Sequence, residues 1–106
     1  MKIIDESLWK QALAKAASRF YGRSITVSSL AGEAELLGKK ELDVALLPGD
    51  YPMDELPESF VEYAYSVTDN VFGYVLVSED CSELYVMGLV KGDKLVWSQL
   101  GDRYAN

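Results

Sequence analysis

The chain of 106 residues contains no histidine and a single cysteine, Cys81. Without histidine, Ser-His and Cys-His catalytic pairs are excluded, and so are most transition-metal sites. One cysteine rules out an internal disulfide and is compatible with a reducing compartment, so we expect a cytoplasmic protein. No apolar run approaches the roughly 20 residues that a membrane span needs. The first ten residues include two acids and no apolar stretch, so we expect no signal peptide.

Lysine and arginine are absent from residues 41–90, although this segment holds eleven of the seventeen acids. Residues 1–40 have a charge balance of +3 and residues 91–106 of +1, so the segment accounts for the net charge of −7. The eleven acids are Glu41, Asp43, Asp50, Asp54, Glu55, Glu58, Glu62, Asp69, Glu79, Asp80 and Glu83. Such an imbalance either keeps small proteins apart in solution or forms a negative surface that steers a basic partner. It would repel nucleic-acid phosphates, so direct nucleic-acid binding is not expected.

The composition is that of an ordinary globular protein, with 49% apolar and 25% charged residues. A chain of this length buries roughly 60–65% of the surface that its unfolded form exposes, which is enough for one hydrophobic core. Internal repeats, linkers and low-complexity tracts are absent. We therefore expect a single compact domain over residues 1–106.

Residues 5–21 have the pattern of one amphipathic helix. Trp9, Leu13 and Phe20 recur at spacings of four and seven residues and form an apolar stripe. Asp5 is suited to cap the N-terminus, and Gly22 is suited to end the helix in a left-handed conformation.

The segment after the helix is harder to interpret. Residues 24–29 alternate between apolar and polar side chains, which predicts a half-buried strand. Residues 30–40 fit a helical face, although Gly32 and Gly38 argue against a helix, and we favour a short helix. Residues 42–47 predict a buried strand that Pro48 stops.

Clearer strand patterns follow, at residues 60–67, 71–77, 84–90 and 94–100. Gly92 and Asp93 form a tight turn with glycine at positive φ, and in the last strand we expect Leu95 and Trp97 to face inward and Val96 outward. The fold class is therefore α+β, with one long N-terminal amphipathic helix packed on a mostly antiparallel sheet of about five to six strands.

All three prolines lie in the loop at residues 48–59, where acids alternate with large apolar side chains. Proline restricts the loop and lowers the entropy cost of docking, and aromatic and methionine side chains are enriched at interface centres. Alternatively, Tyr51, Met53 and Leu56 fold back to cover one end of the core. The candidate partner-binding residues are Asp50, Tyr51, Met53, Asp54, Glu55, Leu56 and Glu58, supported by Glu62.

Catalytic chemistry has weaker support. Asp50 followed by Glu62-Tyr63-Ala64 is similar to metal-dependent nucleases, in which an Asp at a strand end precedes a Glu-x-Lys strand, but Ala64 replaces the lysine. Glycine-rich phosphate loops are absent, and we expect Cys81, which has acidic neighbours, to be a poor nucleophile. We expect no catalytic residues, no cofactor and no metal site. Tyr63, Tyr65, Tyr74 and Tyr85 either pack across strands or share an exposed acidic face with Glu62.

The sequence favours a non-enzymatic binding module that docks on a basic protein, as an inhibitor, an immunity-type protein, a phage anti-defence protein or a regulatory subunit. The alternative is a structural homodimer or a subunit of an assembly. A degenerate or metal-dependent nuclease-like enzyme is the third hypothesis. No membrane partner is expected.

Overall fold

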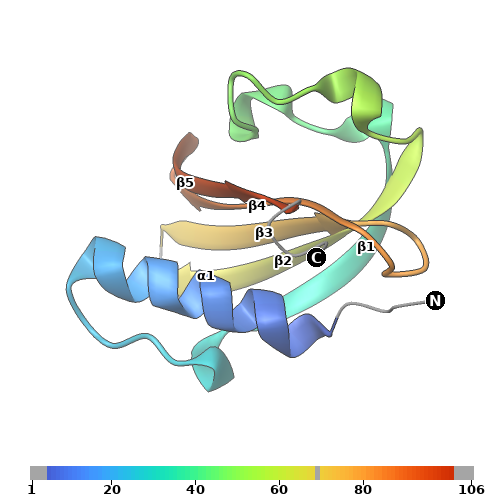
Figure 1. Ribbon diagram of the computed structural model, residues 1–106. Coiled ribbons are helices and arrows are strands. Elements are labelled where there is room, and N and C mark those ends of the chain that lie inside the picture. Colours follow the sequence, from blue (N-terminus) through green and yellow to red (C-terminus); the bar gives the residue numbers. More distant parts are fainter. Residues whose placement is uncertain (1–4, 69, 102–106) are drawn as a thin grey trace.

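The computed structural model describes residues 5–68 and 70–101 and has three layers. Helix α1 (Glu6–Tyr21) lies on one face of a five-stranded antiparallel sheet, and a long loop of residues 39–58 covers the other face (Figure 1). This arrangement confirms the predicted α+β class and the strand number. No helix in the described ranges is long and apolar enough to cross a membrane.

Helix α1 begins and ends where the sequence predicts. The Asp5 carboxylate accepts a hydrogen bond from the Ser7 amide (3.0 Å), and Gly22 ends the helix at φ 65°. Trp9 and Leu13 are 1% and 0% exposed, because the apolar stripe packs on the sheet. Phe20, at the end of the stripe, is 45% exposed.

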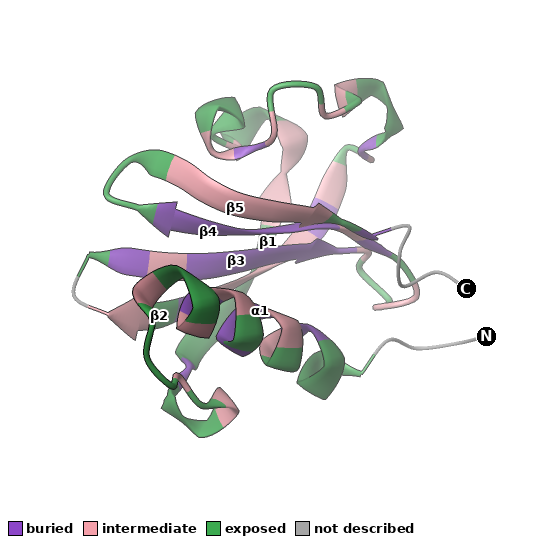
Figure 2. Cartoon of the chain, turned by 60° about the vertical axis from the view of Figure 1, so that its left-hand side comes forward, coloured by how far each residue is buried: buried purple, intermediate pink, exposed green. Residues whose placement is uncertain are grey.

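The sheet is a simple meander in the order β1-β2-β3-β4-β5, so each strand pairs with its neighbours along the chain. The strands are β1 (Ala31–Gly38), β2 (Ser59–Thr68), β3 (Val71–Val77), β4 (Leu84–Lys91) and β5 (Lys94–Leu100). Strands β3 and β4 are almost entirely buried, whereas β1 and β5 form the open edges (Figure 2). Gly92 turns the chain into β5 at φ 66°, as predicted.

Two apolar clusters lie on opposite faces of the sheet. The helix-side cluster joins Trp9 and Leu13 to Val75 and Met87. The loop-side cluster joins Leu47 and Leu56 of the loop to strand residues of alternating position, namely Phe60, Tyr74, Leu76, Val86 and Val90. Successive strand residues point to opposite faces, which explains why the central strands are apolar on both sides.

The predicted strand at residues 24–29 is wrong. The chain there is irregular and ends in a 3₁₀ turn, Val27–Ser29. The Ser18 hydroxyl accepts a hydrogen bond from the Ile25 amide (2.8 Å), and its one proton is shared between the carbonyls of Ala14 (2.8 Å) and Ile25 (3.2 Å). A side chain of α1 thus satisfies the backbone groups that a strand partner would otherwise take. Ile25 and Val27 still pack on the helix-side cluster, so the alternation reflects burial and not pairing.

The short helix expected over residues 30–40 is also wrong, because most of this segment is strand β1. Gly32 lies opposite Tyr65 in β2, and a Cβ atom at this position would overlap the Tyr65 ring. The glycine that disfavours a helix therefore allows close cross-strand packing in a sheet.

The strand predicted at residues 42–47 is a 3₁₀ turn, Val44–Leu46. The Asp43 carboxylate accepts a hydrogen bond from the Ala45 amide (3.0 Å), a local bond that competes with strand pairing. Val44 is 59% exposed, whereas Leu47 is 5% exposed and packs on the sheet.

The facing expected for the last strand needs one correction. Leu89 pairs with Trp97 and Val90 pairs with Leu95, so Val96 is an extra residue in a β-bulge. The bulge sends Leu95 to the loop-side cluster, while Val96 and Trp97 both pack on the helix-side cluster. Leu95 and Trp97 therefore face opposite sides of the sheet.

Candidate functional site

The loop of residues 39–58 is anchored to the sheet by its apolar side chains. Leu56 is 3% exposed, and Tyr51 and Met53 are half-buried against the loop-side cluster. Burial raises the pKa of Tyr51 to about 12, with Glu55 adding to the rise, so its hydroxyl stays protonated at neutral pH. These three predicted partner-binding residues therefore pack on the core. Leu56 does so with most of its surface, and Tyr51 and Met53 do so with part of theirs.

The Tyr74 hydroxyl provides a polar anchor for the same loop. It donates a hydrogen bond to the Leu46 carbonyl (2.7 Å), and burial raises the pKa of this hydroxyl. Three short 3₁₀ turns divide the loop, the last of them at Met53–Glu55. The loop is thus held in one arrangement without regular secondary structure of its own.

The acids of the loop are exposed. They are Glu41, Asp43, Asp50, Asp54, Glu55 and Glu58. Glu62, on β2, is half-buried beneath the loop, and Asp69 lies outside the described residues. Among residues 5–68 and 70–101, the one ion pair joins Lys10 to Glu6 (3.7 Å), on the helix side of the molecule. No acid of the loop is paired with a cation within the part of the chain that is described.

A pocket of about 300 Å³ lies between the loop and strands β1, β2 and β3. Four carboxylates line it, two from the strands and two from the loop. The lining residues are Glu35, Leu37, Glu41, Leu42, Asp43, Leu46, Leu47, Glu62, Phe72 and Tyr74. The floor is therefore apolar and partly aromatic, and we name this cavity the acidic pocket.

Glu35 and Glu62 lie side by side in the acidic pocket because they are directly opposite in the β1–β2 pairing, so their side chains project from the same face of the sheet. Burial raises the pKa of the Glu62 carboxyl, and the negative charge of Glu35 raises it further. The other two carboxylates have local partners: Glu41 accepts from the Gly38 amide (2.9 Å) and Asp43 from Ala45. Only Glu62 of these four was predicted from the sequence to belong to a site.

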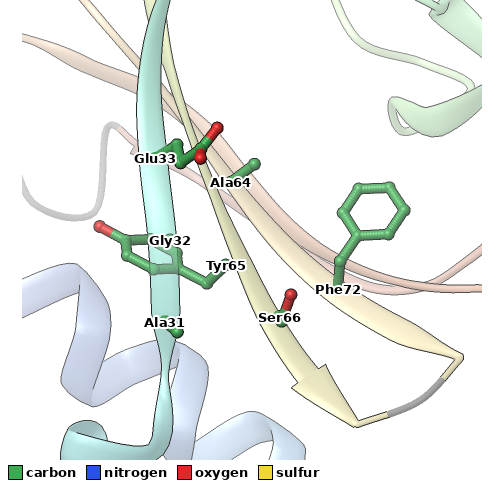
Figure 3. Close-up of a pocket in the computed structure, with 7 residues that line it drawn as sticks. All are labelled: Ala31, Gly32, Glu33, Ala64, Tyr65, Ser66 and Phe72. Atoms are coloured by element: carbon green, nitrogen blue, oxygen red, sulfur yellow. The ribbon is translucent and has the colours of Figure 1, made fainter.

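A second depression of about 450 Å³ lies farther along the edge formed by β1 and β2 (Figure 3). Glu33 supplies its one carboxylate, and Ser66 and Phe72 extend from the neighbouring strands. The Tyr65 ring lies beside Gly32 in the same view. With a single acid and no loop above it, this depression has less to hold a charged ligand than the acidic pocket.

A third depression, of about 550 Å³, lies between α1 and the edge strand β5. It has the opposite charge, because Lys15 and Arg19 line it together with Phe20 and Trp97. The two sides of the sheet thus carry charges of opposite sign.

The four tyrosines considered as a shared platform do not share a face. Tyr63 and Tyr65 pack on the helix-side cluster, while Tyr74 and Tyr85 pack on the loop-side cluster. Tyr65 belongs to a hydrogen-bonded chain in which Trp9 donates to its hydroxyl (2.9 Å) and the hydroxyl donates to Glu6 (2.7 Å). These tyrosines therefore fix α1 and the loop to the two sides of the sheet.

The turn between β3 and β4 carries Cys81 and Asp80. Cys81 has φ 59°, a left-handed conformation that few residues other than glycine adopt. The Asp80 carboxylate accepts hydrogen bonds from the Ser78 and Ser82 hydroxyls (2.8 and 2.6 Å), which lowers its pKa. These contacts close the turn.

The acidic side chains of the described ranges are not grouped as metal ligands. No group of three or more acidic or cysteine side chains there is placed to hold a metal ion. Glu62 lies in the acidic pocket, whereas Asp50, its counterpart in the nuclease-like pattern, is exposed on the loop and does not line that pocket.

The Glu35–Glu62 pair is the feature that sequence reasoning missed. The period-two pattern of residues 32–36, with Glu33 and Glu35 alternating with small and apolar residues, was the signal for a strand. Comparisons with protein-family models, curated proteins and solved structures find no match.

Proposed function

We propose that this protein is a small acidic binding module that docks on a basic partner protein in the cytoplasm, and that it has no catalytic activity of its own. Inhibitors, immunity-type proteins, phage anti-defence proteins and regulatory subunits all act in this way. The observation that carries the proposal is the loop surface, which presents six exposed acids, none of them in an ion pair with a described residue. The same loop carries two lysines, Lys39 and Lys40, so acids outnumber bases by six to two. A surface of net negative charge steers a basic partner and speeds association.

Anchoring of the loop supports the same proposal. Leu47 and Leu56 hold its backbone against the sheet, and Tyr74 binds Leu46. A surface ordered before binding loses less conformational entropy when it docks. Asp50, Asp54, Glu55 and Glu58 contact the partner directly, Tyr51 and Met53 contribute their exposed edges, Leu56 fixes the loop, and Glu62 acts from beneath it.

The test reverses charge on the loop. We expect Asp54→Lys combined with Glu55→Lys to lower the association rate for a basic protein retained from the native host by the immobilised wild-type chain. The rate should fall at least about tenfold at low salt and lose much of its dependence on ionic strength. Lys15→Glu with Arg19→Glu, on the helix side, is the matched control: it changes the net charge by the same amount in the opposite direction and should not lower the rate. An unchanged rate in the loop variant at low salt would contradict the proposal.

The open edge of the sheet favours a second candidate, self-association. Within the described part of the chain, strand β1 has a strand partner on one side only, and Leu36 on this strand is 61% exposed. Edge strands with exposed apolar side chains can pair with another copy of the chain. Light scattering would detect a dimer, and Leu36→Lys should convert it to monomer. A monomer at all concentrations tested would remove this candidate.

A further inference from the structure

The acidic pocket contains a pair of carboxylates for which the described residues supply no cation. Like charges directly opposite each other destabilise a sheet, and Glu35 and Glu62 are such a pair. Within the described ranges, the glutamate carboxylates that take part in a hydrogen bond or an ion pair are those of Glu6, Glu41 and Glu79, and those of Glu35 and Glu62 take part in neither. Among residues 5–68 and 70–101, no lysine or arginine lines the pocket. A cationic ligand would relieve this repulsion.

Partial burial of Glu62 favours the binding of a cation in the acidic pocket. Glu62 is half-buried beneath the loop, and the raised pKa of its carboxyl reflects both burial and the charge of Glu35. A charge that is partly removed from water interacts more strongly with a ligand of opposite charge than a fully solvated one does. Glu62 therefore offers more binding energy to a cation than the exposed acids of the loop, and Glu35, which is exposed, adds a second negative charge beside it.

The shape of the pocket selects the kind of cation. Four leucines, three of them from the loop, and two aromatic residues, Phe72 and Tyr74, line it together with the carboxylates. A ligand with an apolar stem and a charged end can contact both parts. The volume of about 300 Å³ lies at the lower limit of the range for small-molecule pockets, roughly 300–1,000 Å³, which suits a single side chain.

Arginine matches this site better than lysine. Its guanidinium group offers five N–H donors in one plane, which can bind two carboxylates at once, and it stacks on aromatic rings. It is also more weakly hydrated than the lysine ammonium, so its desolvation costs less. We propose that the acidic pocket receives one arginine side chain of the partner protein, with the guanidinium between Glu35 and Glu62 and the stem on the apolar floor. This inference rests on the proposed function and names the residue type that the module recognises.

Titration of the full chain with a small arginine compound tests the pocket directly. We expect N-acetyl-arginine methylamide to cause saturable shifts of backbone amide signals in nuclear magnetic resonance spectra, centred on Glu35, Asp43, Glu62 and Tyr74. The citrulline analogue has nearly the same shape but a neutral urea group, so it should cause no such shifts. The lysine analogue should bind more weakly than arginine. Equal binding of citrulline or tighter binding of lysine would overturn the assignment, as would the absence of saturable shifts.

Matched variants locate the binding. Glu35→Gln with Glu62→Gln keeps the shape of both side chains and should weaken arginine binding by about tenfold or more, because charged hydrogen bonds are lost. Glu33→Gln, on the same face of β1 but outside the acidic pocket, should change it by less than about twofold. Thermal unfolding should show that the double variant is at least as stable as the wild type. Equal losses in the two variants would mean that arginine responds to overall charge alone, and would refute the site.

Binding of the retained basic protein separates this inference from the proposed function. If Asp54→Lys with Glu55→Lys weakens that complex and Glu35→Gln with Glu62→Gln does not, the module docks through its loop and the arginine site is wrong. If both variants weaken it, both proposals are supported. If neither does, both the arginine site and the acidic docking surface fail.

Discussion

The two faces of the sheet are closed in different ways. On one face lies a regular helix with caps at both ends, and its bases point outward beside a groove lined by Lys15 and Arg19. On the other face lies an irregular loop that is held by leucine side chains and one tyrosine hydroxyl and that exposes acids. An irregular loop can therefore cover one face of a sheet as a helix covers the other. Because the loop backbone does not follow a regular hydrogen-bonding pattern, it can also form the wall of a pocket.

The largest difference between the faces should appear when a buried leucine is shortened on each. Leu13→Ala, beneath the helix, should lower the free energy of unfolding by about 3–5 kcal/mol, because the helix and Gly73 beside it cannot close the cavity. Leu56→Ala, beneath the loop, should cost about 2 kcal/mol, since an irregular segment can move inward. Urea unfolding measures both. A larger loss for Leu56 would show that the loop is the more rigid cover.

A smaller difference should follow from removing one hydroxyl on each face. Tyr65→Phe leaves the buried Trp9 indole N–H without its acceptor and should cost about 1–3 kcal/mol. Tyr74→Phe removes a bond to the Leu46 carbonyl and should cost about 0.5–1.5 kcal/mol. Hydrogen exchange sharpens the comparison, because Tyr74→Phe should speed exchange in residues 42–47 and leave α1 unchanged. Faster exchange throughout the molecule would contradict a local role for this anchor.

The smallest expected effect is a gain in stability. Glu62 has a raised pKa in the folded protein, so folding favours its protonated form. Ionisation of Glu62 therefore lowers the free energy of unfolding, and this loss is complete above the raised pKa. Glu62→Gln should therefore stabilise the protein at neutral pH, by less than about 1 kcal/mol because the carboxylate is partly solvated.

The same variant has a defined pH dependence. Its advantage over the wild type should fade as the pH falls through the raised pKa and vanish below the ordinary glutamate value of 4.5, where the wild type is protonated in both states. Glu35, Glu41 and Asp43 also line the pocket, so Glu33→Gln, which lies outside it, serves as the control. An advantage that persists at pH 3 would show that the charge of Glu62 is not its cause.

The parts of the fold that were predictable from the sequence depend on local signals. Asp5, the apolar stripe and Gly22 define α1 within one stretch of chain, and the buried strands β3 and β4 have continuous apolar runs. The predictions for residues 24–47 are wrong because individual side-chain contacts, which the apolar pattern does not show, decide the backbone there. The Ile25 backbone binds Ser18, and Gly32 is required by the Tyr65 ring.

Less of the candidate site than of the fold could be predicted from the sequence. The acids of the loop could be named from the sequence, and the structure finds them exposed. The pairing of Glu35 with Glu62 requires the register of two strands, and one of those strands had been expected to be helical. Tyr51, Met53 and Leu56 could be assigned equally to a partner or to the core, because an apolar residue in a loop has no periodicity to show which side it faces.

The meander topology determines when the helix can pack during synthesis on the ribosome. Each strand can join the one just made, but the apolar stripe of α1, which is made first, packs on residues such as Met87 and Leu89 in the fourth strand. Some seventy residues must therefore emerge before the stripe is covered, which takes several seconds at about 5–20 residues per second. We expect ribosome-bound chains that end before β4 to be cleaved readily within α1 by a protease and to recruit chaperones, and chains that extend past β5 to resist both.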